Sequence, residues 1–507
     1  MRGDRVFWLG PIVLGLGVTG LAAEPAAKPR YRIEYATYLG GAEFDQAREI
    51  IVDPDGSVLV GAQTNSSDMP TTPGAFRRKY AGDDPALGHG GIYGGDCYLV
   101  RLSPDGSRIL AATYFGGSKQ ERNVYGMGLD RKHNVVIASA TRSPDLPTTP
   151  TAFQRKYGGG PSDWMVAKLS GDLTRLIWCT YVGGRGDDFP RGGLAVDEHD
   201  NVYVVGVTNS PDFPTTAGAF QEKFQGTHNA AVVKLKADGS ALLSSTLLGR
   251  GETDTIMGVR VDAAGNLYVA GHIRTADLPV TPGAPQAKHA SQSDCFFAKF
   301  SSDASRLLYA TYLGGVQNEF AEHRLWLGAD GSVLLAGVTS SPDFPTTPGA
   351  FQRKLKGRND GFLTKLSPDG KRFEFSTLLG GSGGEFFLMP TPDAEGNIFV
   401  VGTTQSPDFP VTPDALQGRF AGPAGTEGGE GDGVLAVLSP DGSRVVYATY
   451  LGGSGGDLIR SIALGPQGEV YLVGNTSSPD FPVTPQAVQK TLRGKADAFI
   501  VKLVPTK

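Results

Sequence analysis

Acidic side chains recur along this chain of 507 residues at fixed places in a repeated pattern. One set stands four residues after a glycine pair, as in Gly40-Gly41 followed by Asp45. A second lies in phrases such as SSPDFPTTPGAFQ at 340–352, and a third begins apolar segments such as DCYLV at 96–100. Neighbouring carboxylates can collect Ca²⁺, which takes six to eight oxygen ligands, or accept hydrogen bonds from loop N–H groups. The three sets are Asp45, Glu121, Asp188, Asp254, Glu319, Glu385 and Asp457; Asp68, Asp145, Asp212, Asp277, Asp343, Asp408 and Asp480; and Asp96, Asp163, Asn229, Asp294, Asp360, Asp432 and Asp497.

Both chemistries remain open, and the pattern favours the structural one. A residue required in every repeat is what the association of repeats demands, whereas a ligand site usually needs only one or two of them. The DPDG and SPDG turns lack the twelve-residue spacing and terminal Glu of calcium loops. Calcium at the first set, Asp45 to Asp457, is therefore the alternative, and no other cofactor is indicated.

Ligand contacts are expected where the repeats differ from one another. The segment EFAEHRLWLG at 319–328 is more polar than its equivalents, and the insertions at 81–95 and 421–433 occur in one repeat each. The polar segment is either a ligand site or an ordinary polar strand end with local pairing. The candidate ligand-binding residues are Glu322, His323, Arg324, Trp326, Asp83, Asp84, His89 and Tyr93.

Catalytic motifs are absent from the sequence. It contains no G-x-S-x-G, phosphate-binding loop or dinucleotide fingerprint, and none of its 7 His residues has the spacing of a helical zinc motif. We therefore predict no catalytic residue, although residues from distant repeats can still assemble a site that spacing does not reveal.

Seven copies of a four-strand unit must position these residues. The glycine pairs recur every 65–67 residues, with longer spacings of 76 and 72 where the insertions lie. Each copy has four apolar segments rich in Val, Tyr, Ile and Phe, separated by Gly-, Asn- and Asp-containing turns. Four antiparallel strands repeated radially form the blades of a β-propeller. A Thr before Pro in the TPGAFQ-type segments is a helix start signal, so a short helix is expected in each connection from the second to the third strand.

The order of the segments predicts how the ring closes. The first apolar segment, YRIEYATYL at 31–39, is a fourth strand, and the last, AFIVKL at 498–503, is a third strand. Pairing them completes the seventh sheet and removes an exposed edge. In such blades the second-to-third connections and the links between blades emerge on one face, so all three acidic sets should lie towards that face.

The phrases ATYLGG, SPDFPTTPGAFQ and DxFxAKLSPDGS resemble the SBBP repeat, a seven-bladed β-propeller repeat of exported bacterial proteins. The resemblance covers nearly all of the chain after its N-terminal segment. It implies the fold and an exported location, and it transfers no catalytic residue.

The N-terminus predicts export. Arg2 and Arg5 precede an apolar stretch at 6–22 and small residues at Ala22 and Ala23, which is the layout of a signal peptide. We expect cleavage near residue 23, leaving a single propeller over 24–507 with no transmembrane segment, in the periplasm, at the cell surface or outside the cell. An uncleaved membrane anchor is the alternative.

The charge balance narrows the choice of partner. With 47 basic and 52 acidic residues, the chain lacks the basic character that nucleic acids require. We expect a monomeric binding scaffold without enzymatic activity that contacts a protein or a glycan. The alternatives are a polysaccharide hydrolase or lyase acting at the channel mouth, and a structural module of the cell envelope stabilised by calcium.

Overall fold

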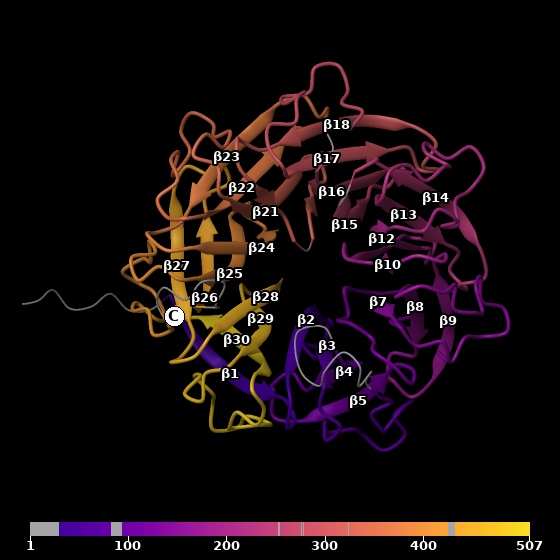
Figure 1. Ribbon diagram of the computed structural model, residues 1–507. Helices are drawn as coiled ribbons and strands as arrows, with labels where there is room; N and C mark the ends of the chain where they lie inside the picture. Colours follow the sequence, from indigo (N-terminus) through magenta and orange to yellow (C-terminus); the bar gives the residue numbers. More distant parts are fainter. Residues whose placement is uncertain are drawn as a thin grey trace, which may run out of the picture.

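The computed structural model describes residues 30–82, 94–251, 254–274, 276, 278–322, 324–423 and 431–506. Their strands form seven antiparallel sheets arranged as blades around a central axis (Figure 1). All regular elements in these ranges are β-strands, which confirms the predicted all-β propeller. In the same ranges, no helix has the length and hydropathy needed to cross a bilayer.

Each blade runs outward from an inner strand a to an outer strand d, and blades 1 to 7 are numbered by strand a. The inner strands a are β2 (Asp45–Val52), β6 (Gly126–Leu129), β10 (Asp188–Phe189) with β11 (Leu194–Val196), β15 (Thr255–Val261), β19 (Glu319–Phe320) with β20 (Trp326–Leu327), β24 (Glu385–Pro392) and β28 (Asp457–Leu464). Strands b are β3 (Val58–Thr64), β7 (Val135–Thr141), β12 (Val202–Thr208), β16 (Leu267–Ile273), β21 (Val333–Thr339), β25 (Ile398–Thr404) and β29 (Val470–Thr476). Strands c are β4 (Asp96–Leu102), β8 (Asp163–Leu169), β13 (Asn229–Leu235), β17 (Asp294–Phe300), β22 (Asp360–Leu366), β26 (Asp432–Leu438) and β30 (Asp497–Pro505). Strands d are β5 (Ile109–Phe115), β9 (Leu176–Val182), β14 (Leu242–Leu248), β18 (Leu307–Leu313), β23 (Phe373–Leu379), β27 (Val445–Leu451) and β1 (Tyr31–Leu39).

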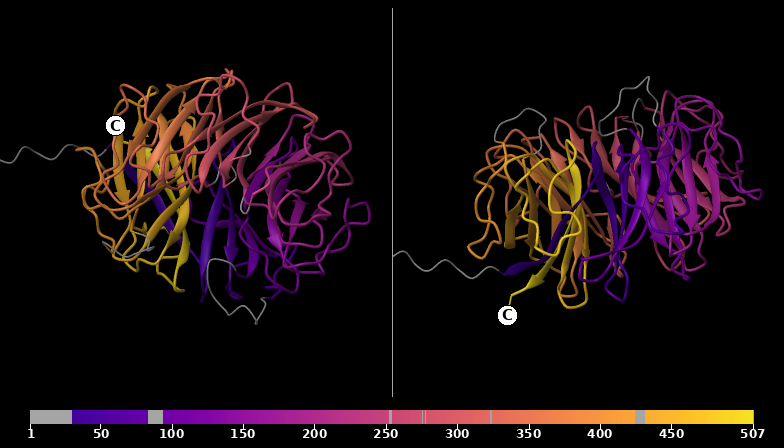
Figure 2. Two further views of the ribbon diagram at one scale, coloured as in Figure 1. Left: turned by 45° about the horizontal axis from the view of Figure 1, so that its top comes forward. Right: turned by 90° about the horizontal axis from the view of Figure 1, so that it is seen from below.

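The ring closes through the first and last strands, as predicted. Strand β1 pairs antiparallel with β30, from Tyr31 opposite Pro505 to Leu39 opposite Ala498. The two strands lie side by side, indigo and yellow, in Figures 1 and 2. Tyr35 and Tyr38 of β1 are fully buried, so the closing strand contributes to the core on both of its faces.

The hydrophobic core is divided into clusters that lie between neighbouring blades. Cys97 and Cys179 belong to the cluster between blades 1 and 2, and Cys295 to that between blades 4 and 5. All three thiols are buried and unpaired, so they act as small apolar core residues.

The short helices expected in the connections from b to c are a wrong prediction. In the segment from Thr72 to Ala75, the N–H of Ala75 donates to the carbonyl of Thr72 at 3.2 Å, which closes one β-turn. Gly74 has φ = +81°, a conformation that ends helical geometry. Pro at the second turn position and Gly with positive φ at the third are the signature of a type II turn, so the Pro that suggested a helix start belongs to a turn.

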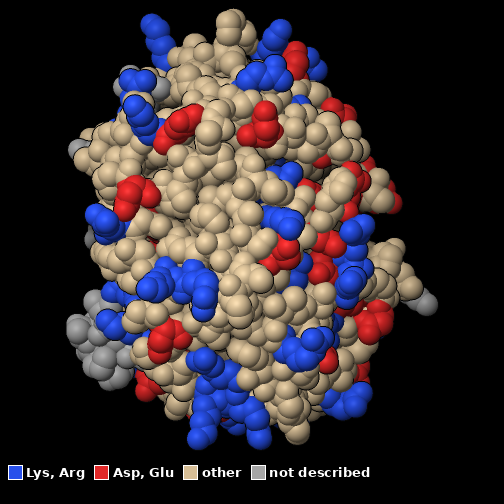
Figure 3. Space-filling model, turned by 90° about the vertical axis from the view of Figure 1, so that its right-hand side faces the viewer, with Lys and Arg blue, Asp and Glu red and all other residues tan. Residues whose placement is uncertain are grey.

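The outer rim carries charges of both signs. Figure 3 shows Lys and Arg interspersed with Asp and Glu over the side of the ring that bears β9 and β14. This mixed surface agrees with the mild charge balance of the sequence.

Candidate functional site

The acidic residue at the start of each strand a fastens the link between blades. In blade 3, Asp188 is fully buried and accepts hydrogen bonds from the Gly184 N–H at 2.7 Å, the Ser210 hydroxyl at 2.8 Å and the Thr208 hydroxyl. Each of the other six acids of this set also accepts backbone or hydroxyl hydrogen bonds from its own blade. These are the contacts that the structural interpretation requires.

The Asp of the repeated PDFP phrase binds the same link from the other side. Asp212 accepts a hydrogen bond from the Arg185 N–H at 2.9 Å, and Asp480 accepts one from the Ser454 N–H at 2.8 Å. Asp68, Asp145, Asp343 and Asp408 repeat the contact, and Asp277 lies outside the described residues. The phrase thus ties the b-to-c connection of a blade to the linker that enters that blade.

The third set holds the far end of the same connection. Asp163 accepts hydrogen bonds from the Gly158 N–H at 2.7 Å and the Gln154 amide at 3.3 Å. The equivalent residues of the other six blades accept a hydrogen bond from the corresponding backbone N–H. All three sets therefore lie towards one face of the ring, as predicted, and this face is called the loop face below.

Two of the sets meet in pairs beside the glycine that ends strand d. A Cβ on Gly183 would lie 2.7 Å from Cγ of Asp163 and 2.8 Å from a carboxyl oxygen of Asp188, so only glycine leaves room for both acids. Burial raises the pKa of Asp163 to about 7, and the adjacent Asp188 adds to that shift. Burial likewise raises the pKa of Asp188 to about 6. Both carboxyls are therefore expected to titrate close to neutral pH, which makes folding depend on pH.

The free energy of unfolding is expected to fall as the pH rises from 5 to 8. A carboxyl whose pKa is raised by folding binds its proton more tightly in the folded state, so its contribution is complete below about pH 4 and is lost as the pH rises through about 7. The slope approaches about 1.4 kcal/mol per pH unit for each such group. Asp163→Asn should flatten this slope in urea unfolding at pH 5, 6.5 and 8. Asp105→Asn is the control, because hydrogen bonds from Ser103 and Ser107 lower the pKa of Asp105 to about 2. An unchanged slope in Asp163→Asn would contradict the raised pKa of Asp163.

In the described part of the chain, the side chains of the first acidic set do not come together as a calcium site. Within those ranges, no three or more His, Cys, Asp or Glu side chains gather closely enough to hold a metal ion. The carboxylates at these positions accept protein hydrogen bonds instead, as described above for Asp188.

The polar segment of blade 5 reaches across the channel. Glu322 accepts a hydrogen bond from Arg48 of blade 1 at 2.8 Å, and Arg324 forms an ion pair with Glu49. Arg324 also donates to the carbonyl of Met127 in blade 2 at 2.8 Å. Glu322 and Arg324 therefore lie at the channel, and their partners belong to distant blades, so the pairing is not local.

Of the remaining candidate ligand-binding residues, the structure describes only Trp326. Trp326 is half-buried and packs against the core cluster between blades 5 and 6. His323 and the insertion residues Asp83, Asp84, His89 and Tyr93 lie outside the described residues.

In each of the cross-channel ion pairs, Arg48–Glu322 and Arg324–Glu49, one partner is buried and the other is partly buried. Arg48 and Glu49 have exposed side-chain fractions of 3% and 1%. Burial raises the pKa of Glu49, while the guanidinium groups of Arg324, Arg48 and Arg260 act against that shift. Burial also lowers the pKa of Arg260 to about 9. Such a cluster is held together by its opposite charges, because any member left alone would be an uncompensated buried charge.

Above this cluster, on the loop face, lies a pocket of about 350 Å³. It is called the channel-mouth pocket, and its walls come from the loop-face ends of the inner strands of blades 2 to 5 and from the loops beside them. Its lining residues are Arg122, Asp187, Phe189, Arg191, Val207, His228, Thr255, His272, Arg274, Ser293 and Phe320.

Aromatic rings and guanidinium groups stack in the wall of this pocket. The guanidinium carbons of Arg122 and Arg191 lie 4.4 and 5.5 Å from the centre of the Phe189 ring. The His272 ring lies 4.4 Å from that of Phe320, centre to centre. Burial and the neighbouring Arg191 lower the pKa of His272 to about 4, so its imidazole is neutral at pH 7. The wall therefore combines cationic and aromatic groups, a combination suited to a polar ligand.

No residue that lines this pocket was predicted from the sequence, although a sequence pattern indicates it. The residue directly after the acid of strand a differs from blade to blade, whereas the acid itself recurs. Arg122, Phe189, Thr255 and Phe320 occupy this position in blades 2 to 5, and all four line the pocket. Gln46, Phe386 and Leu458 hold it in the other blades. Variation at the position after this constant acid was therefore the sequence feature that indicated the site.

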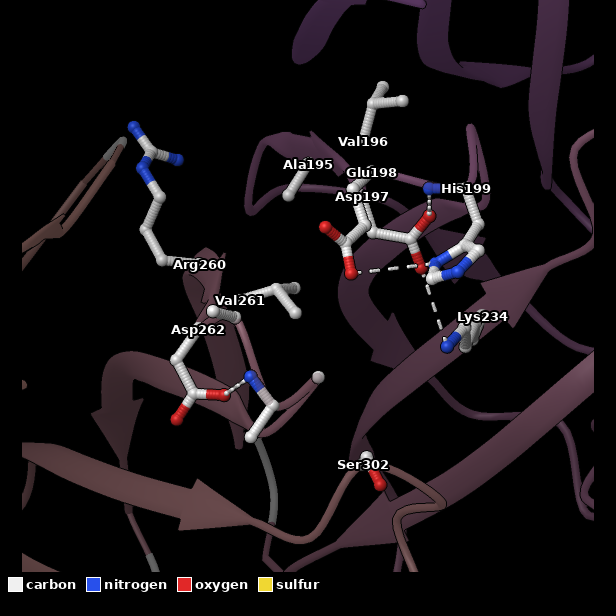
Figure 4. A pocket seen from close by; sticks show the side chains of 13 residues that line it. Ala195, Val196, Asp197, Glu198, His199, Lys234, Arg260, Val261, Asp262 and Ser302 are labelled. Atoms are coloured by element: carbon white, nitrogen blue, oxygen red, sulfur yellow. Dashed lines mark hydrogen bonds and ion pairs between the residues drawn. The ribbon is translucent and has the colours of Figure 1, made fainter.

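A second hollow, of about 410 Å³, lies on the opposite face between the turns from a to b of blades 3 and 4 (Figure 4). Its charged groups serve local structure. Asp197 accepts a hydrogen bond from the Asn201 N–H at 2.8 Å and lies 3.5 Å from Nζ of Lys234. Asp262 makes the same turn with Asn266, at 2.8 Å. Because these contacts recur in other blades, we regard this hollow as a groove between turns.

Comparisons with known proteins agree with the fold. Residues 177–214 match the SBBP family, described as "Beta-propeller repeat". No curated protein sequence matches the chain. Solved structures with a similar arrangement include polysaccharide lyase Uly1 (8% identity, 95% of this chain and 100% of that one covered, TM-score 0.45) and BamB from Moraxella catarrhalis (11%, 94% and 100%, TM-score 0.38). A protein of unknown function from Dyadobacter fermentans is similar at 10% identity, with 94% and 100% covered and a TM-score of 0.40.

Likenesses this distant carry no argument about function. The family match lies in blades 2 and 3, where it spans strand d of one blade and strands a and b of the next with the PDFP phrase. It includes the glycine pair after strand d and the beginning of the PDFP phrase, two of the features by which the sequence resembles that family. The chain is thus a seven-bladed β-propeller, and its residues 177–214 match the SBBP repeat.

Proposed function

We propose that this chain is an exported, non-catalytic propeller that binds a saccharide in the channel-mouth pocket. The observation that carries the proposal is the pocket itself, which is lined by residues of four blades and where the residue after the acid of strand a varies between blades. Its volume of about 350 Å³ lies at the small end of the range for ligand pockets. A sugar ring at the end of a glycan is a ligand of suitable size, whereas a folded protein partner would need a larger surface.

Rigid support favours binding at this place. Phe189 packs in a small cluster with Tyr125, Ala140 and Val207, and the cross-channel ion pairs lie directly beneath, since Arg48 stacks on Tyr125 at 4.6 Å. A wall whose rotamers are fixed by packing loses little entropy when a ligand enters.

The variant Thr255→Phe tests this proposal. Blades 3, 5 and 6 already carry Phe at the equivalent position, so the repeat accommodates the ring, which in blade 4 would fill part of the pocket. Leu458→Phe makes the same change in blade 7, outside the pocket, and is the matched control. With protein recovered from the periplasm, isothermal titration against neutral and acidic trisaccharides should show binding by the wild type and Leu458→Phe, and at least tenfold weaker binding by Thr255→Phe.

Two results would contradict the proposal. Binding that Thr255→Phe leaves unchanged would place the ligand elsewhere, and failure of all the saccharides to bind would remove the ligand class. Cleavage products in the titrated samples would show instead that the chain is a hydrolase or lyase. Retention of the full-length protein in the cytoplasm would contradict export.

A further inference from the structure

The channel-mouth pocket has an excess of positive charge. Three arginines, Arg122, Arg191 and Arg274, line it together with one carboxylate, Asp187. The Asp187 carboxylate accepts a hydrogen bond from the Ser162 hydroxyl and is thereby already engaged. His272 adds no charge at pH 7, because its pKa is about 4. A pocket with this balance attracts anions and repels cations.

Two of the pocket arginines, Arg191 and Arg274, differ from the arginines beneath the pocket in how their charge is balanced. Arg48 and Arg324 each have a carboxylate partner across the channel, in Glu322 and Glu49. Neither Arg191 nor Arg274 forms an ion pair with any carboxylate of the described residues. A guanidinium presents a planar set of N–H donors that matches the two oxygens of a carboxylate, or two of the three oxygens of a sulfate ester.

Two buried polar atoms in the wall lack hydrogen bonds. Nδ1 of His272 and Nε of Arg191 are buried and have no hydrogen-bond partner among the described residues. The His272 side chain belongs to a residue that is 7% exposed, so its unpaired nitrogen is costly unless a ligand or water meets it. Polar atoms of this kind at a pocket wall mark positions where a ligand completes the hydrogen bonding.

From these observations, and on the basis of the proposed function, we infer that the ligand of the channel-mouth pocket is an acidic saccharide. Its carboxylate or sulfate group lies against Arg191 and Arg274, and its ring lies beside Phe320 and His272. The hydroxyls of Ser293 and Thr255, which also line the pocket, supply further polar contacts. Affinity then depends on a charge interaction and weakens as salt screens it.

Three trisaccharide-sized probes separate the possibilities. Trigalacturonate carries only carboxylates, a κ-carrageenan oligosaccharide carries only sulfates, and maltotriose is neutral. By isothermal titration in 50 mM salt, we expect one or both acidic probes to bind at least tenfold more tightly than maltotriose, and the binding to weaken in 500 mM salt. Preference between the two acidic probes identifies the anionic group as carboxylate or sulfate.

Variants at Arg191 test the role of the guanidinium. Arg191→Gln should weaken binding of the preferred acidic probe at least tenfold, and Arg191→Lys should weaken it less, because the charge remains. Arg185→Gln is the matched control, since Arg185 is 88% exposed and pairs with Asp212 outside the pocket. Thermal unfolding of each variant checks that the fold is retained.

The outcomes distinguish this inference from the proposed function. If maltotriose binds, is blocked in Thr255→Phe, and binds as tightly as the acidic probes, the pocket is a saccharide site and the acidic specificity is wrong. If an acidic probe binds equally to Arg191→Gln and to the wild type, the assigned anion contact is wrong. If none of the three probes binds, both proposals fail together.

Discussion

Replacing Glu49 with glutamine is expected to lower the free energy of unfolding by about 3–5 kcal/mol. The substitution keeps the volume of the side chain but removes the charge that faces Arg324, and Arg260 lies close enough to add to the repulsion. The guanidinium groups of Arg324 and Arg260 then lack compensation. Urea unfolding followed by tryptophan fluorescence measures the loss.

Glu374→Gln is the control for this change. Glu374 pairs with Lys365 at 3.1 Å on the rim, where its side chain is 24% exposed. Partly exposed pairs of this kind contribute about 0–1 kcal/mol. If Glu49→Gln were as stable as Glu374→Gln, the cross-channel ion pairs would not hold the inner strands together. Replacing Glu49 and Arg324 together with Leu and Met should recover much of the loss, because apolar pairs often substitute for buried ion pairs.

Removal of strand β1 is expected to abolish the folded monomer. A chain that begins at Gly40 lacks Tyr35, Tyr38 and Leu39, which are buried in the wild type. Burial of such side chains contributes about 1.5–3 kcal/mol each, so their sum approaches the roughly 5–15 kcal/mol of a typical domain. The chain would also expose the edge of β30, which β1 pairs along its length.

A chain that begins at Arg30 is the matched control, because it keeps β1 complete. Light scattering coupled to gel filtration should find this chain monomeric and the shorter one aggregated or unfolded. A shorter chain that remained monomeric, with a thermal transition like that of the control, would show that six blades and a three-stranded seventh form a stable ring.

The architecture could be predicted from the sequence because the same four-strand pattern recurs seven times. The phrases around Asp188 and Asp212 mark the same linker in each blade, and the offset of the segment at 31–39 predicts closure. The helix prediction failed where two rules compete for the same residues. Pro at the first helical position and Pro at the second turn position look alike in sequence, and Gly74 decides for the turn.

The site was less accessible to sequence reasoning. Glu322 and Arg324 were recognised as unusual polar residues of their repeat, but their partners Arg48 and Glu49 lie more than 270 residues away in sequence and could be identified only once the ring was closed. The pocket is harder still to predict from the sequence, because its wall combines residues from four blades. A self-comparison of the chain finds what the blades share, whereas Arg191 and His272 belong to what they do not share.

The cross-channel ion pairs restrict changes in the number of repeats during evolution. Repeat arrays commonly gain or lose units by duplication and deletion, and each unit here would fit its neighbours through the same linker contacts. An eighth blade would widen the ring and draw Arg48 away from Glu322, while loss of one of the blades between them would bring these side chains into collision. The two cross-channel ion pairs join blades that are not neighbours in the ring, and they thereby fix the number of blades.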